Sequence, residues 1–190
     1  MQHVGTQTLE TPRLTLRRFT RQDAPAMYSG WAADPEVTRY VSWPAHKDIG
    51  VTAALLELWE EAYRLDSEYN WCIVLGGSPI GSVGLVDVDG KLRKAYLGYV
   101  LARPYWGRGI ATEAAAAVLD YSFFKAGFHR IAAIHNPDNL ASGAVMRKLG
   151  MQREGRIRGA FMDNQGRYID VEQYAILSRE WKERRHAFIG

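Results

Sequence analysis

Residues 96–120 read YLGYVLARPYWGRGIATEAAAAVLD, and this stretch decides the fold. Residues 96–101 are apolar, aromatic and β-prone, which predicts a strand. Pro104 ends the strand because proline has no amide hydrogen for a sheet ladder. Gly107 and Gly109 follow, and then an alanine-rich run with high helix propensity. The stretch therefore predicts a strand, a glycine-rich turn and a helix.

This order of elements is typical of an anion-binding site. The first amides of a helix have no partner within the helix, and they carry the positive end of its dipole. Gly107 and Gly109 let a phosphate approach the backbone, and Arg108 between them adds a charged donor. We interpret the turn as a binding site for a diphosphate.

Two common phosphate-binding loops fit this turn badly, and a third fits well. A P-loop requires G-x-x-x-x-G-K-[ST], which the sequence lacks, and a dinucleotide fingerprint requires a glycine at the position of Thr112. Residues 106–111, WGRGIA, resemble the Q/R-x-x-G-x-G/A turn of the GNAT acyltransferases, which binds the pyrophosphate of acetyl-CoA. Trp106 stands in the Gln/Arg position of that pattern, and this departure leaves the backbone amides unchanged.

Length and composition predict an ordinary globular enzyme. The chain has 190 residues, 47% hydrophobic and 24% charged, which predicts one domain over residues 1–190. A single cysteine, Cys72, excludes a disulfide framework and a thiolate-rich metal site. The net charge of +3 suits an anionic ligand such as CoA, whereas a block of Lys and Arg typical of nucleic-acid binding is missing. The apolar runs are too short for a bilayer and the N-terminus lacks a signal-peptide pattern, so we expect a cytoplasmic protein, monomeric or homodimeric, with no membrane partner.

The N-terminal part predicts one strand and two helical regions. Residues 9–19 read LETPRLTLRRF and predict a first strand with one solvent-facing side, because Leu14, Leu16 and Arg18 alternate with Arg13, Thr15 and Arg17. A helix capped by Thr20 or Asp23 follows, and Asp34 starts a second short helical turn. Residues 49–65 predict an amphipathic helix whose apolar face holds four side chains: Leu55, Leu58, Trp59 and Ala62.

An irregular aromatic loop, residues 42–48, separates these helices. The loop either walls a substrate slot, with Tyr40 and Trp43 as its substrate-binding residues, or packs its tryptophan on the edge of the core. The sequence leaves both readings open.

The remainder of the chain predicts strands joined by short turns and helices. Gly76-Gly77-Ser78-Pro79 and Asp89-Gly90 mark two hairpins. A helix is expected at residues 139–149, ended by Gly150, and the polar tail after Trp181 is expected to fray. Further strands are predicted at residues 69–75, 80–88, 130–135, 152–161 and 168–177, with 130–135 parallel to 96–101 through a helical crossover.

The predicted order, β-α-α-β-β-β-α-β-α-β-β, matches the α/β GNAT fold, and the resemblance runs nearly end to end. LETPRLTLRRF, GYVLARPYWGRGIATEA, NPDNLAS and YAILSREW are similar in order and spacing to the RimJ/RimL branch of N-terminal amine acetyltransferases. The resemblance implies a mixed, mostly antiparallel central sheet with a splayed parallel strand pair and flanking helices. It also implies an enzyme that transfers an acetyl group from acetyl-CoA directly to a primary amine.

Within this resemblance, several residues are expected to bind acetyl-CoA. The backbone of Leu101 would lie along the pantetheine arm, and the pyrophosphate would bind at Gly107, Arg108, Gly109, Ile110, Ala111 and Thr112. Glu113, in the first turn of the helix, suits the helix dipole, and we favour that role over a catalytic one.

Asn139 and Ser142 form a second cluster. Their spacing alone is explained by helix capping, with Asn139 as the N-cap. The resemblance implies more: Asn139 would bond the pantetheine, and Ser142 would lie beside the sulfur and act as general acid for the departing thiolate. Many GNAT enzymes use a tyrosine there, but no tyrosine lies between Tyr121 and Tyr168.

The general base is left open by the sequence. The candidates are His135 at a strand end, since histidine is a common general base, and Asp170 and Glu172 on the last strand. A water relay is the remaining alternative. Cys72 lies inside a predicted strand and far in sequence from any base-like motif, so an acyl-enzyme on this cysteine is not expected.

The expected acceptor is a protein or peptide α-amine. Attack requires a neutral amine, and an α-amine with a pKa of about 7.7–8.0 is far more often neutral near pH 7.5 than a lysine with a pKa of about 10.4. The alternatives are a small-molecule amine, such as a polyamine, an amino acid or an antibiotic, and a catalytically silent acyl-CoA-binding module. Nucleic-acid binding would require steeply salt-dependent affinity, which we do not expect.

Overall fold

The protein is built on one eight-stranded sheet, seen in a computed structural model that describes residues 3–187. The strand order across the sheet is β1-β2-β3-β4-β5-β6-β8-β7. The strands are β1 (Leu9–Glu10), β2 (Leu14–Arg17), β3 (Tyr69–Leu75), β4 (Ser78–Asp89), β5 (Lys94–Leu101), β6 (Arg130–His135), β7 (Gln152–Met162) and β8 (Tyr168–Leu177). The α-helices are α1 (Ala24–Met27), α2 (Pro35–Thr38), α3 (Ile49–Ala62), α4 (Ile110–Tyr121), α5 (Leu140–Lys148) and α6 (Ser178–Ala187).

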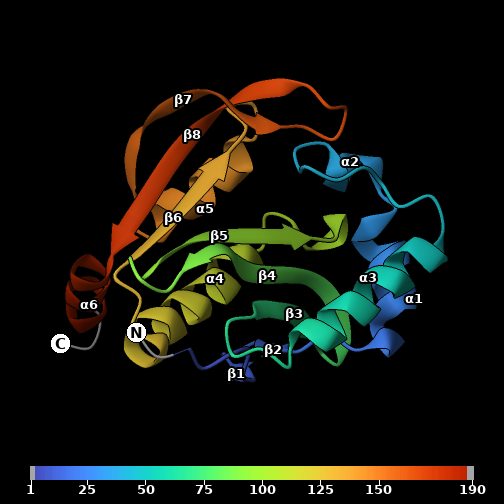
Figure 1. Cartoon of the computed structure of the whole chain (residues 1–190), viewed down its shortest axis with the longest axis horizontal. Coiled ribbons are helices and arrows are strands. Elements are labelled where there is room, and N and C mark those ends of the chain that lie inside the picture. Colours follow the sequence, from blue (N-terminus) through green and yellow to red (C-terminus); the bar gives the residue numbers. More distant parts are fainter. Residues whose placement is uncertain (1–2, 188–190) are drawn as a thin grey trace.

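The splayed parallel pair predicted from the sequence is present between β5 and β6. These strands pair over three positions, from Lys94 opposite Arg130 to Tyr96 opposite Ala132. Beyond Tyr96 they diverge, and Figure 1 shows the wedge between them opening toward α2. The other strand neighbours pair antiparallel, so the sheet is mixed and mostly antiparallel, as expected.

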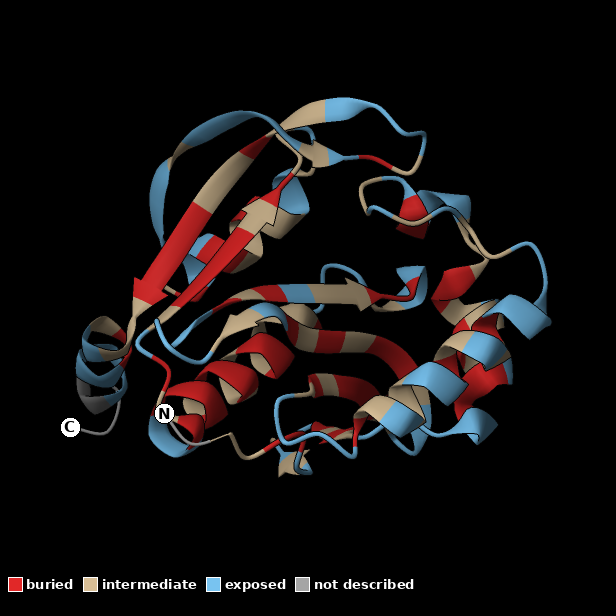
Figure 2. Ribbon diagram, viewed as in Figure 1, coloured by how far each residue is buried: buried red, intermediate tan, exposed pale blue. Residues whose placement is uncertain are grey.

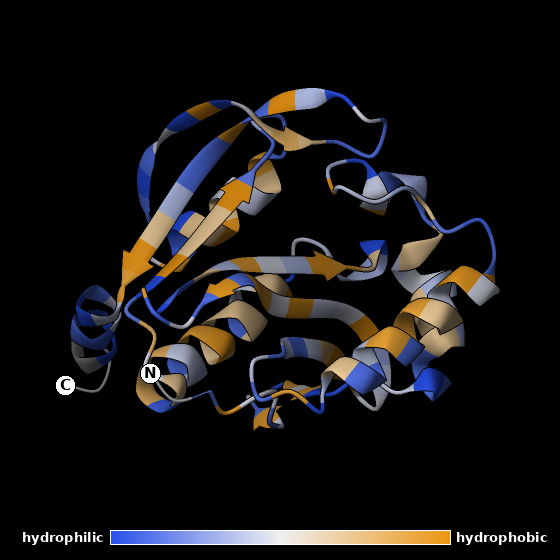
Figure 3. Cartoon of the chain, viewed as in Figure 1, coloured by the Kyte–Doolittle hydropathy of each residue, from blue (hydrophilic) through white to orange (hydrophobic). Residues whose placement is uncertain are grey.

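Helices cover both faces of the sheet. On one face, α4 packs its buried alanine and branched side chains against Trp71, Val83 and Leu97. On the other face, a smaller core joins α1 and α3 to Cys72 and Val100. Figure 2 shows buried residues concentrated in the inner strands and α4, whereas β7 is largely exposed; Figure 3 shows that β7 and α6 are also largely hydrophilic.

The first strand predicted from the alternation at residues 13–18 is present as β2, and a short strand that the sequence did not predict, β1, precedes it. β1 turns back and pairs antiparallel with β2, placing Leu9 opposite Leu16. Pro12 lies in the turn and has no amide to donate to a ladder. The Thr11 hydroxyl oxygen accepts a hydrogen bond from the Leu14 amide at 2.9 Å, which closes the turn.

The apolar face predicted for the helix at 49–65 was partly wrong. The α3 helix ends at Ala62, and its fully buried residues are Thr52 and Leu56, whereas Leu58 is 68% exposed. The buried face of the helix is therefore rotated relative to the prediction. It includes Thr52, whose hydroxyl contacts His46 of the preceding loop at 2.8 Å, a polar contact that hydrophobicity alone does not reveal.

The segment after Trp181, which was expected to fray, is instead helical as far as Ala187. The α6 helix continues to that residue and is tied to the body of the protein. Trp181 Nε1 donates to Asp120 at 2.8 Å, and Arg184 donates to the Lys148 carbonyl at 2.9 Å. These polar contacts hold a segment whose hydrophilic composition suggested a free tail.

Candidate active site

The glycine turn has the backbone that its sequence requires. Gly107 and Gly109 have φ of 71° and 75°, in the left-handed region that favours glycine, and Gly109 is the N-cap of α4. The Glu113 amide donates to the Gly109 carbonyl at 3.0 Å, so the amides before Glu113 precede the first α-helical hydrogen bond. A Cβ added at Gly107 would meet no atom within 4 Å. The turn is thus open and lined by amides, which fits a pyrophosphate.

Glu113, in the first turn of α4, connects the glycine turn to the β1–β2 turn. Its carboxylate accepts hydrogen bonds from the Thr11 hydroxyl at 2.6 Å and from Arg13 Nε at 2.6 Å. Arg13 also donates to the Arg108 carbonyl at 3.1 Å. Burial alone would raise the pKa of Glu113, but these hydrogen bonds lower it below its usual value. Glu113 therefore fastens the β1–β2 turn to α4, a larger structural role than the helix-dipole contact expected from the sequence.

Trp106 and Arg108 complete the turn. Trp106 Nε1 donates to the Leu101 carbonyl at 2.8 Å, so this carbonyl at the end of β5 already has a partner. The Arg108 guanidinium lies over the Tyr105 ring, 5.6 Å from its centroid, and the residue is exposed. The tryptophan in the Gln/Arg position thus holds the turn against the strand.

The structure brings Ser142 together with a tyrosine that the sequence analysis missed. Tyr99 Oη on β5 lies 2.9 Å from Ser142 Oγ and 3.0 Å from the Ser142 carbonyl oxygen. Burial raises the pKa of Tyr99 to about 12, so the phenol keeps its proton near neutral pH. Tyr99 precedes Tyr121 in the chain, and only the alternation of side chains along β5 could have indicated that it faces Ser142.

Asn139 caps α5, as its sequence position indicated. Its Oδ1 accepts a hydrogen bond from the Ser142 amide at 3.2 Å. The cap fixes the first turn of α5, and with it the Ser142 side chain, beside the wedge between β5 and β6.

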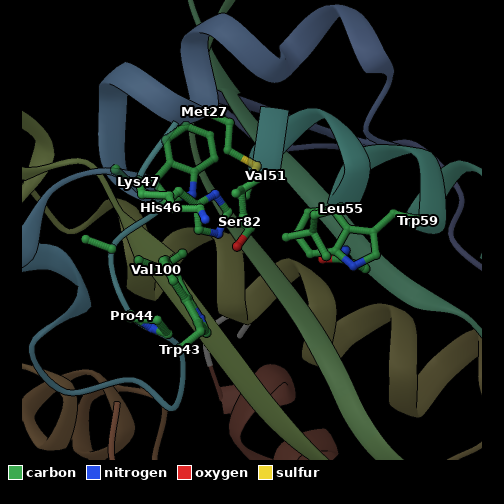
Figure 4. A pocket seen from close by; sticks show the side chains of 13 residues that line it. Met27, Trp43, Pro44, His46, Lys47, Val51, Leu55, Trp59, Ser82 and Val100 are labelled. Carbon is green, nitrogen blue, oxygen red and sulfur yellow. The ribbon is translucent and has the colours of Figure 1, made fainter. Parts of the chain in front are cut away.

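A pocket of about 610 Å³ lies on the other face of the sheet, against α1 and α3. Figure 4 shows it from close by. Its walls are mostly apolar and aromatic: Met27, Trp31, Trp43, Pro44, Ala45, His46, Lys47, Val51, Leu55, Trp59, Asn70, Ser82 and Val100. Trp43, predicted as a substrate-binding residue, lines this pocket, whereas Tyr40 is not among its lining residues and instead lies under the Arg39 guanidinium.

The pocket and the Tyr99–Ser142 pair lie on opposite faces of the same strand. Val100 lines the pocket, and Tyr99 immediately before it contacts Ser142. Successive side chains of a strand point to opposite faces. Both groups therefore flank the splayed edge of β5, one from each side.

The three base candidates do not line this pocket in the described part of the chain. His135 is buried; its Nδ1 donates to the Asn136 carbonyl at 2.8 Å, and a Cβ added at Gly143 would lie 2.8 Å from its Nε2. Asp170 pairs with Arg156 at 3.0 Å. Glu172 pairs with Arg153 at 2.6 Å, and a hydrogen bond from that guanidinium lowers the pKa of Glu172.

Three further observations bear on the chemistry. Burial raises the pKa of the Cys72 thiol to about 12, so it stays protonated and is a poor nucleophile. Within residues 3–187, no group of three or more His, Cys, Asp or Glu side chains is placed to hold a metal ion. None of the described helices is long and apolar enough to cross a bilayer.

Comparison with known proteins agrees with this geometry. Residues 13–152 match the acetyltransferase (GNAT) domain. The chain is 32% identical over 177 residues to the uncharacterized N-acetyltransferase p20 of Bacillus licheniformis, covering 92% of this chain and 98% of that protein. It is 33% identical over 171 residues to the uncharacterized N-acetyltransferase YoaA of Bacillus subtilis, covering 89% and 96%.

Solved structures show the same fold. A GNAT-family acetyltransferase from Bacillus anthracis superposes with a TM-score of 0.79 at 27% identity, covering 92% of this chain and all of that one (100%). The splayed strands, the open glycine turn before α4 and these matches lead to one conclusion: the chain belongs to the RimJ/RimL-like branch of the GNAT family, N-acetyltransferases that use acetyl-CoA.

Proposed function

We propose that this enzyme acetylates the α-amine of a peptide or protein, and that the amine enters through the three-tryptophan pocket formed by Trp31, Trp43 and Trp59 with their neighbours. Acetyl-CoA supplies the activated acetyl thioester. The amides of the Gly107–Gly109 turn hold its pyrophosphate, and the free edge of β5 beyond Tyr96 holds the pantetheine arm. The thioester then lies in the wedge, between the pocket on one face and Ser142 on the other.

The Tyr99–Ser142 pair supplies the proton for the leaving thiolate in this proposal. Ser142 lies at the start of α5, beside the wedge, and its hydroxyl shares a hydrogen bond with the Tyr99 hydroxyl on β5, in which either group can be the donor. Because the Tyr99 phenol stays protonated, it can replace the proton that Ser142 gives up. A hydroxyl pair aimed at developing negative charge acts mainly in the transition state.

The observation that carries the acceptor assignment is the lining of the pocket. Among the described residues no aspartate or glutamate lines it, and Lys47 is its charged member. A polyamine or aminoglycoside carries several ammonium groups, which require carboxylates or other acceptors when they are desolvated. A peptide N-terminus carries one amine beside an apolar side chain, which the tryptophans accommodate.

Trp31 adds a second argument for a peptide. Trp31 lines the pocket, and its indole N–H is buried without a hydrogen-bond partner within the described residues. A peptide carbonyl accepts a hydrogen bond from such a donor, whereas an ammonium group only donates. The pocket therefore complements a peptide better than a polyamine.

Relatives differ in acceptor and do not decide the question. The spermidine N(1)-acetyltransferase of Escherichia coli (strain K12) is 27% identical over 127 residues. The ribosomal-protein-S5-alanine acetyltransferase from Vibrio fischeri shares the fold, with a TM-score of 0.80 at 20% identity. The proposal depends on the pocket of this chain.

A thiol-release assay tests the acceptor directly. We expect kcat/KM to be higher for short peptides with a free, apolar first residue than for spermidine, an aminoglycoside or an Nα-blocked lysine peptide. Trp43→Ala should raise KM for the apolar peptide, because it removes a wall of the pocket, while Trp106→Phe on the CoA side should leave that KM unchanged. Preference for spermidine would overturn the acceptor assignment, and acetyl-CoA binding without turnover on any amine would favour the silent-module alternative.

A further inference from the structure

His46 is the titratable imidazole of the acceptor pocket. It comes from the irregular loop between α2 and α3, and Figure 4 shows its side chain in the pocket with Ser82 and Val100. The loop is fixed there, because the His46 amide donates to the Ala32 carbonyl at 2.8 Å. The Trp43 ring packs against the imidazole with centroids 5.5 Å apart. The sequence analysis did not single out this residue, since nothing in the loop has a regular pattern.

One nitrogen of the imidazole is held by a buried hydroxyl. Nδ1 of His46 lies 2.8 Å from Oγ1 of Thr52, and Thr52 is fully buried in the first turn of α3. Thr52 is the hydrogen-bond partner of this ring within residues 3–187. In the tautomer in which Nδ1–H donates to the Thr52 oxygen, Nε2 carries the lone pair and is left for a ligand.

The surroundings of the ring favour its neutral form. Burial lowers the pKa of His46 below its ordinary value of 6.5, and the charge of Asp48 opposes this shift without cancelling it. Lys47 is the charged lining residue of the same loop, while the α1, α3 and sheet walls contribute neutral side chains to the lining. At neutral pH the ring is therefore able to accept a proton.

We propose that His46 is the catalytic base of the reaction, accepting the proton from the amine through Nε2. This proposal rests on the acceptor pocket of the proposed function, and it assigns the two proton transfers to opposite faces of the splayed strand. As the amine nitrogen forms its bond to the acetyl carbon, one N–H proton passes to Nε2 of His46. The carbon–sulfur bond breaks, and the sulfur takes one proton from Ser142, which Tyr99 and then solvent replace. His46 returns its proton to solvent, so the products are the N-acetyl amine and CoA thiol.

The test is a pH profile of kcat/KM for a peptide acceptor. In the wild type, kcat/KM should fall as the pH decreases. Protonation of the amine alone should cause the fall between the pKa of the amine and that of His46, and protonation of both groups should cause it below the pKa of His46. His46→Gln should lower kcat/KM about 10²- to 10⁴-fold and abolish the second proton dependence. The acetyl-CoA Kd should not change, because His46 lies on the amine side. The exposed His129 provides the matched control, and His129→Gln should keep the wild-type profile.

Variants of Thr52 separate this role from a merely structural one. Thr52→Val keeps the shape of the side chain but removes the partner of Nδ1, so we expect reduced kcat/KM and a shifted acid limb. Thr52→Ser keeps the hydroxyl and should restore both. The two Thr52 variants test the proposal even if His46→Gln fails to fold. Identical pH profiles of kcat/KM for Thr52→Val and Thr52→Ser would overturn it.

Failure of the base assignment is distinguishable from failure of the acceptor assignment. If the wild type acetylates only polyamines, the peptide proposal is wrong, and the same pH profile is measured with the polyamine. If His46→Gln acetylates the preferred amine at the wild-type rate and retains the two-proton limb, the base assignment is wrong whatever the acceptor.

Discussion

Tyr99 Oη and Ser142 Oγ, from residues on different elements, lie 2.9 Å apart at the open edge of β5. The contact joins the strand to the first turn of α5 across the wedge in which the two parallel strands separate. The two hydroxyl groups share one hydrogen bond, so we expect them to act together as the proton donor to the leaving thiolate.

Removing either hydroxyl should therefore lower kcat by a similar factor. We expect Ser142→Ala and Tyr99→Phe each to reduce kcat about 10²-fold, with little change in the acetyl-CoA Kd, because the donor acts on developing charge. The double variant should be scarcely slower than either single variant. Steady-state kinetics and calorimetric acetyl-CoA binding measure both quantities.

The control is Tyr121→Phe, which removes a hydrogen bond to the Gly5 carbonyl of 2.8 Å and should lower Tm without lowering kcat. Since the pKa of Tyr99 is raised to about 12, the wild-type profile should show no alkaline loss from this group near pH 9–10, about two units or more below that value. A loss seen only in Tm or in acetyl-CoA affinity would make Ser142 a helix-start residue alone.

Backbone geometry at Gly109 should control acetyl-CoA affinity. Gly109→Ala places a Cβ on a residue with φ of 75°, and left-handed backbone costs about 1–2 kcal/mol for a residue other than glycine. If the turn shifts to relieve this strain, the amides move and affinity should fall about tenfold. Isothermal titration with acetyl-CoA measures the effect.

Gly77 offers a matched control for the glycine turn. It has φ of 82° in the β3–β4 hairpin, and a Cβ added there meets no atom within 4 Å. Gly77→Ala should lower stability by a similar amount and leave acetyl-CoA affinity unchanged. Equal acetyl-CoA affinity in Gly109→Ala and the wild type would argue against the assignment of this turn.

Glu113 should contribute stability that depends on pH. Its folded-state pKa is lowered, so its contribution is present above the ordinary glutamate pKa of 4.5 and is lost as the pH falls through the folded-state value. Glu113→Gln should lower the free energy of unfolding by about 1 kcal/mol near pH 7, a modest value because Arg13 is partly exposed to solvent.

Urea unfolding at several pH values measures this difference. The gap between wild type and Glu113→Gln should shrink in acid, while exposed Glu183→Gln should show no comparable gap at any pH. A gap that stays constant down to strongly acidic pH would contradict the role of the Glu113 carboxylate in fastening the β1–β2 turn.

Much of the fold was predictable because its signals are local. The strand and helix of residues 96–120 follow from strand and helix propensities, and the turn between them follows from the positive φ that glycine allows. The hairpin at Gly76-Gly77 follows from turn chemistry, and these two glycines have φ of 56° and 82° in the structure. Asn139 as the N-cap of α5 and Gly150 with φ of 78° at its end follow from capping rules.

The site was less predictable because its contacts are long-range. The Tyr99–Ser142 pair joins residues 43 positions apart, on the part of β5 that lies beyond its pairing with β6. His46 lies in a loop without periodicity, and its place depends on Thr52, a polar residue on the buried face of α3. The α6 helix was missed because polar contacts hold it, including the bond from Trp181 to Asp120.

The most direct test of the central claim is the site of acetylation on one peptide that carries both a free α-amine and a lysine. Incubation with enzyme and acetyl-CoA, followed by tandem mass spectrometry at low conversion, gives the ratio of the two products in a single reaction. We predict acetylation of the α-amine ahead of the lysine, because the pocket of this chain suits a single amine beside an apolar side chain and the α-amine has the lower pKa, about 7.7–8.0 against about 10.4. Acetylation of the lysine in preference to the α-amine would contradict it.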